Sequence, residues 1–288
     1  VYQQMLIMAL SNPFHLAEGA AFELFGALAP VASLGRLLAW DNEDESDGPV
    51  VDLCESQPCR AVDQKPESPS EHLRRLELGA LLIALHEPAP LQTAIQRQLL
   101  EQVRPHWLGR LQRRHERTDT NGSCNLVMGL ARIHNRLLGH STEQSSAQML
   151  DSSAGGTCLQ CNGDQGSELS VGQLLLLLGG NGTSTLAMVR WRHLNAEGLH
   201  LGLRYLKGLP RPVWLRRAPG AQTHPGVLQS TPDTGSVWHH GLWLPAGQFG
   251  EGENLWLQLV SVNSQTVIPL PAANLTTAQV SRHPLTLT

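Results

Sequence analysis

Two short patterns in the middle of the chain carry residue types that recognise charged, planar ligands. Arg113-x-x-x-Arg117 places two guanidinium groups four residues apart, and Asp151-x-Ser153-x-x-Gly156 follows downstream. A guanidinium can pair in a fork with a phosphate or with O6 and N7 of guanine. A carboxylate accepts from N–H donors, a hydroxyl donates to a phosphate, and glycine lacks the Cβ that blocks close approach of a backbone. Together the patterns predict a site for an anionic ligand.

Three further markers follow these patterns in a fixed order. They are Val171-Gly172-Gln173-Leu174, Val189-Arg190-Trp191 and Leu201-Gly202-Leu203. Each piece alone is a weak signal, but the ordered set extends over roughly a hundred residues. In this order the patterns resemble the PilZ-domain family.

In that family the two first patterns bind cyclic di-GMP on the outside of a six-stranded antiparallel barrel. The resemblance implies the same for the matched residues here, which are Arg113, Arg117, Asp151, Ser153 and Gly156. A cyclic dinucleotide offers two phosphates and two guanine edges, and each good bidentate contact to guanine contributes about 1–3 kcal/mol of discrimination. Cyclic di-GMP is therefore the expected ligand.

Three more residues are candidates for the same site. Arg114 lies inside the first pattern and is included in the ligand-binding set. Arg190 and Trp191 extend the site in a second interpretation, the tryptophan by stacking on a base. Because an aromatic residue in a strand is more often part of a core, Trp191 can be interpreted either as a ligand contact or as a core residue.

The arginine spacing has competing interpretations. It also occurs in two other pairs, Arg110/Arg114 and Arg132/Arg136. Arg113/Arg117 is preferred because a predicted strand and then the Asp-x-Ser-x-x-Gly pattern follow it in family order. Without a ligand, the arginines would be cations at a helix C-terminus, and Asp151 and Ser153 would belong to a plain turn.

The spacing of the cysteines argues against a metal site, and the absence of known catalytic motifs argues against an enzyme. Cys158-x-x-Cys161 has the spacing of half a zinc site, but side chains three apart on a strand point to opposite faces. We therefore predict no metal. The chain has no nucleophile elbow, P-loop, HExxH motif or paired-carboxylate motif, and no signature of cyclic di-GMP synthesis or degradation. A non-enzymatic receptor without a further cofactor is predicted.

Composition sets the broad class. Of the 288 residues, 41% are hydrophobic and 16% are charged, a balance typical of a soluble globular protein. The net charge of −4 argues against sequence-independent binding of nucleic acid polymers. No apolar run reaches the eighteen residues that indicate membrane insertion, and the five cysteines, an odd number, suggest a reducing cytoplasm.

Apolar periodicity predicts a helical first third of the chain. The expected helices are Val1–Leu10, Phe14–Leu28, Ala32–Trp40, Glu71–His86 and Leu91–Leu111, the last kinked at Pro105. Val50–Leu53 is the one strand expected there. Because the helical spacing begins at the first turn and no Met precedes it, we expect the chain to continue upstream.

After Arg117 short β-like runs predominate. The expected strands up to Leu206 are Cys124–Leu130, Gly156–Cys161, Gln173–Leu178, Ala187–Trp191 and Leu199–Leu206, with a helix-like piece at Ala131–Leu138. More strands follow from Val213 onward. The predicted fold is α+β: a mainly helical domain over 1–110, a PilZ-like β-barrel over 111–217, and a C-terminal β extension or second small β domain over 218–288.

Two functions follow from this organisation. The first is a receptor in which cyclic di-GMP changes a domain arrangement or a partner interaction. The second is a ligand-independent PilZ-like module that serves as a protein interaction or assembly scaffold. It is motivated by Ser152, where the family usually has an apolar residue, and by the helix-like insertion. Both involve a protein partner of unknown identity, and self-association stays open.

Overall fold

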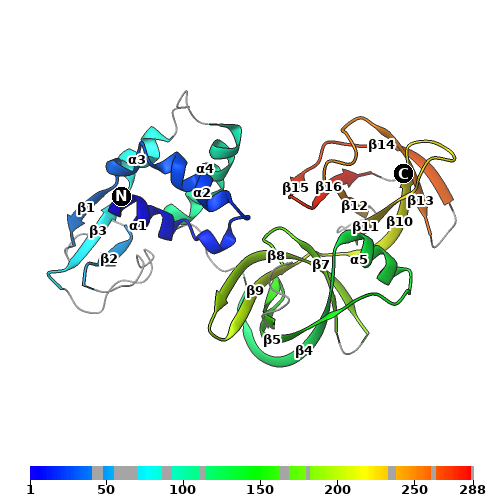
Figure 1. Cartoon of the computed structure of the whole chain (residues 1–288), viewed down its shortest axis with the longest axis horizontal. Coiled ribbons are helices and arrows are strands. Elements are labelled where there is room, and N and C mark those ends of the chain that lie inside the picture. Colours follow the sequence, from blue (N-terminus) through cyan, green and yellow to red (C-terminus); the bar gives the residue numbers. More distant parts are fainter. Residues whose placement is uncertain are drawn as a thin grey trace. The chain divides into compact units, whose positions relative to one another are not determined.

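The chain forms two compact units in a computed structural model, Val1–Arg114 and His115–Thr288 (Figure 1). The residues that the structure describes are 1–40, 48–54, 70–85, 93–109, 115–161, 169–179, 182–232, 238–260 and 264–286. The expected mixture of helices and antiparallel strands is confirmed, whereas the three predicted domains stay a prediction.

The first unit combines helices with a small antiparallel sheet. Its helices are α1 (Tyr2–Leu10), α2 (Ala20–Leu28), α3 (Gly79–Ala84) and α4 (Ala94–Trp107), with 3-10 turns at Pro13–His15 and Ala32–Leu34. Its strands are β1 (Arg36–Ala39), β2 (Val50–Asp52) and β3 (Leu73–Glu77), in the order β1-β3-β2. Thr93 and Gln96 form a capping box that begins α4. Apolar side chains of all four helices and of β2 and β3 share one core.

Three helix predictions in this unit are wrong in whole or in part. Ala32–Trp40 was expected to be helical but forms a 3-10 turn followed by β1. In Glu71–His86, the first half is β3 and only Gly79–Ala84 is α-helical. Strand pairing of β3 with both β1 and β2 explains the difference, because those contacts are not visible in a local pattern. The second predicted helix begins only at Ala20, after a left-handed Gly19.

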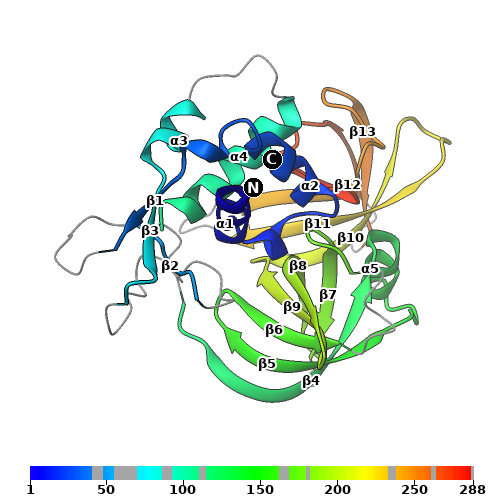
Figure 2. The same ribbon diagram turned by 60° about the vertical axis from the view of Figure 1, so that its left-hand side comes forward.

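The second unit opens with a closed six-stranded antiparallel barrel, seen from the side in Figure 2. Its strands are β4 (Thr118–Met128), β5 (Ser145–Ser153), β6 (Gly156–Cys161), β7 (Leu174–Leu178), β8 (Ser184–Asn195) and β9 (Gly198–Tyr205). They follow one another around the barrel in the order β4-β5-β6-β9-β8-β7. Alternate residues point inward and form one apolar core, which includes Leu126, Leu159, Leu175, Val189 and Leu201.

A seven-stranded antiparallel sheet follows the barrel. Its strands are β10 (Leu209–Arg216), β11 (His224–Pro232), β12 (Trp238–Pro245), β13 (Asn254–Leu259), β14 (Ser264–Pro269), β15 (Leu275–Thr276) and β16 (Val280–Leu285). Their order is β14-β13-β10-β11-β12-β16-β15. One face carries a second apolar core that includes Val213, Leu228, Leu242 and Leu257.

Part of the outside of the barrel is covered by this C-terminal sheet. Outward residues of β4, β7 and β8 share a core with β11, β12 and β16. Helix α5 (Leu130–Leu137), the helix-like insertion of the sequence, completes this core with Leu130 and Ile133. The insertion therefore joins the barrel to the C-terminal sheet, and the remaining barrel strands, β5, β6 and β9, contribute no residue to this core.

Candidate ligand-binding site

The Asp-x-Ser-x-x-Gly pattern lies on the hairpin of β5 and β6. Asp151 and Ser153 belong to the end of β5, not to a free turn, and Gly156 is the first residue of β6. Ser153 pairs with Gly156 across the hairpin, and Asp151 pairs with Cys158. Asp151 and Ser153, two residues apart, therefore share the outer face of the barrel.

Asp151 is held by two different donors. Its Oδ1 accepts the backbone N–H of Cys158 at 3.0 Å, and its Oδ2 accepts from Arg117 Nη1 at 2.6 Å. Arg117 and Asp151 lie 34 positions apart in sequence, and their side chains are 32% and 19% exposed. The structure thus brings one residue of each pattern into direct contact. The guanidinium of Arg117 keeps donors beyond the one given to Asp151.

A second contact places the arginine-bearing segment against the same hairpin. A Cβ on Gly155 would lie 2.7 Å from Cδ2 of His115, so this imidazole rests on the hairpin turn. The segment from His115 to Arg117 therefore passes over the Asp-x-Ser-x-x-Gly pattern. Arg113 and Arg114 lie outside the described residues, so their part in the site stays a prediction.

The serine and the last glycine of the pattern are engaged in shaping the hairpin. Ser153 Oγ donates to the carbonyl of Gly156 at 3.1 Å and accepts the N–H of Gly155 at 3.3 Å. A Cβ on Gly156 would lie 1.9 Å from the carbonyl oxygen of Leu203 on β9. Close packing of two strands thus requires glycine here, and contact of either residue with a ligand stays a prediction.

Trp191 lies on the outer face of the barrel beside this hairpin. Asp151, Cys158, Gly202 and Trp191 are successive partners across β5, β6, β9 and β8. A Cβ on Gly202 would lie 1.9 Å from Nε1 of Trp191, so the indole lies over the glycine and leans along the sheet. Neighbouring strands are about 4.8 Å apart, which puts Gly202 roughly 10 Å from Asp151. The half-buried indole is outside the barrel core.

Arg190 occupies a special position next to this tryptophan. The pairing of β8 with β9 shifts between Val189 and Trp191, which makes Arg190 the extra residue of a β-bulge. Bulges re-aim a side chain relative to its neighbours. Arg190 is exposed, and so is Arg204 on the neighbouring strand. Both predicted extension residues therefore lie on the same barrel face as Asp151.

Ser152, which lies between Asp151 and Ser153, points the other way. It pairs with Thr157, whose side chain is fully buried, and its hydroxyl lies 3.4 Å from that of Tyr205. The polar side chain therefore has a polar neighbour at the barrel interior. Asp151 and Ser153, on either side of Ser152, point outward.

The two cysteines of β6 are separated by the pleat, as predicted. Cys161 belongs to the barrel core together with Cys124, whereas Cys158 is the outward neighbour of Asp151. Burial raises the pKa of the Cys158 thiol, with a further increase from Asp151 and an opposing effect of Arg117. This thiol is therefore protonated at neutral pH. Among the residues that the structure describes, no three His, Cys, Asp or Glu side chains are grouped to hold a metal ion.

The alternative arginine pair that is described lies elsewhere. Arg132 and Arg136 belong to α5, and Arg132 forms an ion pair with Glu143 at 3.1 Å. This pair has the same spacing as Arg113/Arg117, but within the described residues it makes no hydrogen bond or ion pair with the hairpin of β5 and β6. The other pair, Arg110/Arg114, lies outside the described residues.

Comparison with known proteins leaves the family open. No protein-family profile and no curated protein matches the sequence. One matching solved structure is that of the inhibitor of motility (MotI/DgrA) from Bacillus subtilis, with 8% identity over 58% of this chain and 88% of the other. Its TM-score of 0.18 is too low to support a shared fold or function. In the described part of the chain, no helix is long and apolar enough to cross a membrane.

Sequence reasoning missed two residues at this face. His115 was treated only as a spacer between arginines, and Arg204 was not considered. A signal for Arg204 was present, because β9 alternates leucines with outward residues and Arg204 follows Gly202 by two positions. No signal in the sequence pairs His115 with Gly155.

Proposed function

We propose that the chain is a receptor for cyclic di-GMP that binds the nucleotide on the outer barrel face around Arg117 and Asp151. The observation that carries this proposal is the ion pair between these two residues, because it joins the two patterns that predicted the ligand. A bound guanine edge or phosphate would meet a guanidinium whose position is already fixed. Such preorganisation lowers the cost of binding.

The chemistry of the neighbouring residues supports the same ligand class. Arg117 offers further donors to a phosphate or to guanine O6 and N7, and Asp151 keeps lone pairs to accept from guanine N1 and N2. Trp191 presents a half-buried ring on the same barrel face, on which a base can stack. Adenine lacks the N1–H and N2 donors that Asp151 would read. Binding should therefore favour cyclic di-GMP over cyclic di-AMP.

Calorimetric titration of the whole chain with cyclic di-GMP tests the proposal. Arg117→Ala and Asp151→Asn should each weaken binding by roughly 5- to 150-fold, which corresponds to the loss of one bidentate contact. Arg132→Ala is the matched control, because it removes an arginine of the same spacing and also breaks an ion pair. Absence of binding by the parent chain, or equal losses for Arg117→Ala and Arg132→Ala, would contradict the proposal.

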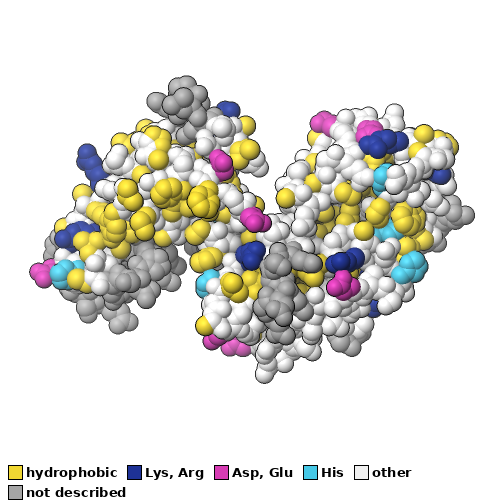
Figure 3. All heavy atoms as spheres, in the orientation of Figure 1, with side chains coloured by type: hydrophobic (Ala, Val, Ile, Leu, Met, Phe, Trp, Pro, Cys, Tyr) yellow, Lys and Arg dark blue, Asp and Glu magenta, His cyan; other side chains and the backbone are white. Residues whose placement is uncertain are grey.

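A scaffold function is the second candidate, favoured by the surface of the first unit. Helices α1 and α2 carry exposed large apolar side chains, Tyr2, Met5, Phe22 and Phe25, of which Phe22 is 87% exposed. Figure 3 shows hydrophobic side chains gathered on this unit. Surfaces of this kind often mark protein interaction sites. Two results together would favour this function: the parent chain binds no cyclic di-GMP, and the Phe22→Ser variant loses the self-association or partner binding that the parent shows.

A further inference from the structure

Three arginines from three strands converge on one side of the second unit. Arg190 is the bulge residue of β8, Arg204 points outward from β9, and Arg282 belongs to β16 of the C-terminal sheet. Burial, and after it the charge of Arg204, lowers the pKa of the half-buried Arg282. Strand pairing places the three arginines near one another. Arg204 pairs with Met188, two residues before Arg190, and Met188 shares a buried core with Trp243, the strand partner of Arg282. A guanidinium group carries a positive charge near neutral pH.

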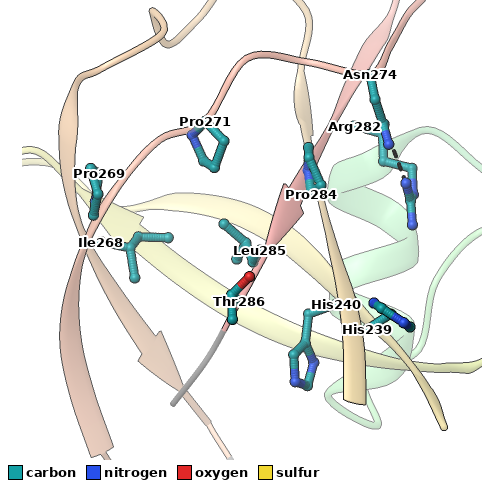
Figure 4. A pocket seen from close by; sticks show the side chains of 10 residues that line it. All are labelled: His239, His240, Ile268, Pro269, Pro271, Asn274, Arg282, Pro284, Leu285 and Thr286. Atoms are coloured by element: carbon teal, nitrogen blue, oxygen red, sulfur yellow. Dashed lines mark hydrogen bonds between the residues drawn. The ribbon is translucent and has the colours of Figure 1, made fainter. Parts of the chain in front are cut away.

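Arg282 is held in one orientation by its own sheet. Its Nη1 donates to Asn274 Oδ1 at 3.2 Å, and its guanidinium lies 5.9 Å from the ring centre of Trp243. A Cβ on Gly241 would lie 2.6 Å from this guanidinium, so the glycine provides the room that the group occupies. Figure 4 shows Arg282 and Asn274 together at one side of an open cleft of about 650 Å³. Solvent and small ligands can therefore approach the group.

These like charges repel one another, and no carboxylate offsets them among the described residues. None of the ion pairs within the described ranges includes any of the three arginines. Guanidinium groups contributed by two adjoining sheets offer a set of donors suited to a phosphate. We propose that Arg190, Arg204 and Arg282 form a phosphate-binding site that links the barrel to the C-terminal sheet.

The site is continuous with the barrel face described above. Arg204 is the strand partner of Gly156, and Arg190 adjoins Trp191. A phosphate of cyclic di-GMP is therefore one source of the anion, and this identification rests on the proposed function. Free phosphate is the other source. If cyclic di-GMP supplies the phosphate, the C-terminal sheet contacts the nucleotide directly through Arg282.

Arginine side-chain NMR tests the site without the nucleotide. The whole chain, with labelled arginine Nε, is titrated with sodium phosphate against sodium chloride at equal ionic strength. Phosphate should shift the Nε–Hε signals of Arg190, Arg204 and Arg282. It should leave that of Arg216, whose guanidinium donates to Gln265 on β14, unchanged. Equal shifts at all four arginines, or none at the three, would overturn the proposal.

Calorimetry with cyclic di-GMP then distinguishes the two sources. If the nucleotide supplies the phosphate, Arg204→Gln and Arg282→Gln should each weaken binding about tenfold or more, and Arg216→Gln should not. Arg282→Lys keeps the charge and checks that any loss does not come from misfolding. Unchanged nucleotide binding by Arg204→Gln, with the phosphate shifts present, assigns the site to free phosphate. If the parent chain binds no cyclic di-GMP, the proposed function fails while the phosphate titration still decides this site.

Discussion

Strands β7 and β9 of the barrel differ in what covers their outer sides. β7 is five consecutive leucines: Leu175 and Leu177 face the barrel core, and Leu174 and Leu176 face the core shared with the C-terminal sheet. In β9 the inward leucines alternate with His200, Gly202 and Arg204. Strands buried on both faces read as continuous apolar runs, and half-covered strands alternate. The two strands thus mark two halves of the barrel, one covered by the C-terminal sheet and one whose outer face carries His200 and Arg204.

This separation assigns different roles to the two halves. The covered half, β4, β7 and the adjoining part of β8, stabilises the second unit through buried leucines. The half formed by β5, β6 and β9 carries the Arg117–Asp151 ion pair, the indole over Gly202, and Arg204. Substitutions in the first half should change stability, and outward polar substitutions in the second should change binding.

The largest effect is expected in the covered half, from Leu176→Ala. Leu176 is fully buried, and its removal leaves a cavity between the barrel and the C-terminal sheet. We expect the free energy of unfolding to fall by about 2–5 kcal/mol. Urea denaturation measures it, with Leu194→Ala as control because Leu194 on β8 is 64% exposed. Similar losses for both variants would remove the distinction between covered and open positions.

A smaller loss is expected where β6 and β9 of the other half are tightly packed, from Gly156→Ala. The new Cβ would lie 1.9 Å from the Leu203 carbonyl, so β6 and β9 must separate locally. Overpacking of this kind costs typically about 1–3 kcal/mol. In Gly122→Ala the nearest atom would be 3.9 Å away, and this control should change little. If Gly156→Ala keeps full stability and loses only nucleotide binding, the glycine serves the ligand and not the strand pair.

The stability of the second unit should depend on pH through His134 on α5, the helix that joins the barrel to the C-terminal sheet. This imidazole is fully buried, with its ring centre 4.2 Å from that of Trp214, and burial lowers its pKa below 6.5. The unfolded chain therefore binds the proton more readily. Stability should be complete above about pH 6.5 and should fall as the pH drops from there through the folded pKa.

His134→Phe keeps an aromatic ring against Trp214 and removes this titration. Thermal denaturation of both proteins between pH 5 and 8 should show the parent losing more stability than the variant towards acid. Because both proteins share every other titrating group, the difference between their curves isolates His134. Parallel curves over this range would show that His134 does not link folding to pH.

Much of the second unit could be predicted because its strands carry a local signal. The alternation in β9, the leucine run of β7 and the small residues Gly156 and Gly202 all reflect contacts made within or next to one strand. Their positions in the sequence therefore indicated strands, and the structure confirms them. The motif order also pointed to Arg117 and Asp151, which the structure places in contact.

The rest depends on contacts that no local pattern contains. In β3, buried Leu73 and Leu76 are three residues apart, which favours a helix, yet pairing with β1 and β2 makes it a strand. Strands β10 and β11 were expected only as part of an undivided β region. The core that the barrel shares with the C-terminal sheet includes Met188 and Trp243, and this joining of two sheets has no counterpart in sequence spacing.

The smallest effect should come from Ser152→Val, which places an apolar residue at the inward position of the Asp-x-Ser-x-x-Gly pattern. Ser152 makes only a 3.4 Å contact with the Tyr205 hydroxyl, so its loss and the gain of apolar burial roughly cancel. We expect a change in unfolding free energy within about 1 kcal/mol. Nucleotide affinity should not change, because the side chain faces away from Arg117 and Asp151. An affinity change as large as that of Arg117→Ala would mean that the inner face of β5 affects ligand binding. The assignment of binding to outward residues and of stability to inward residues would then fail at the candidate site itself.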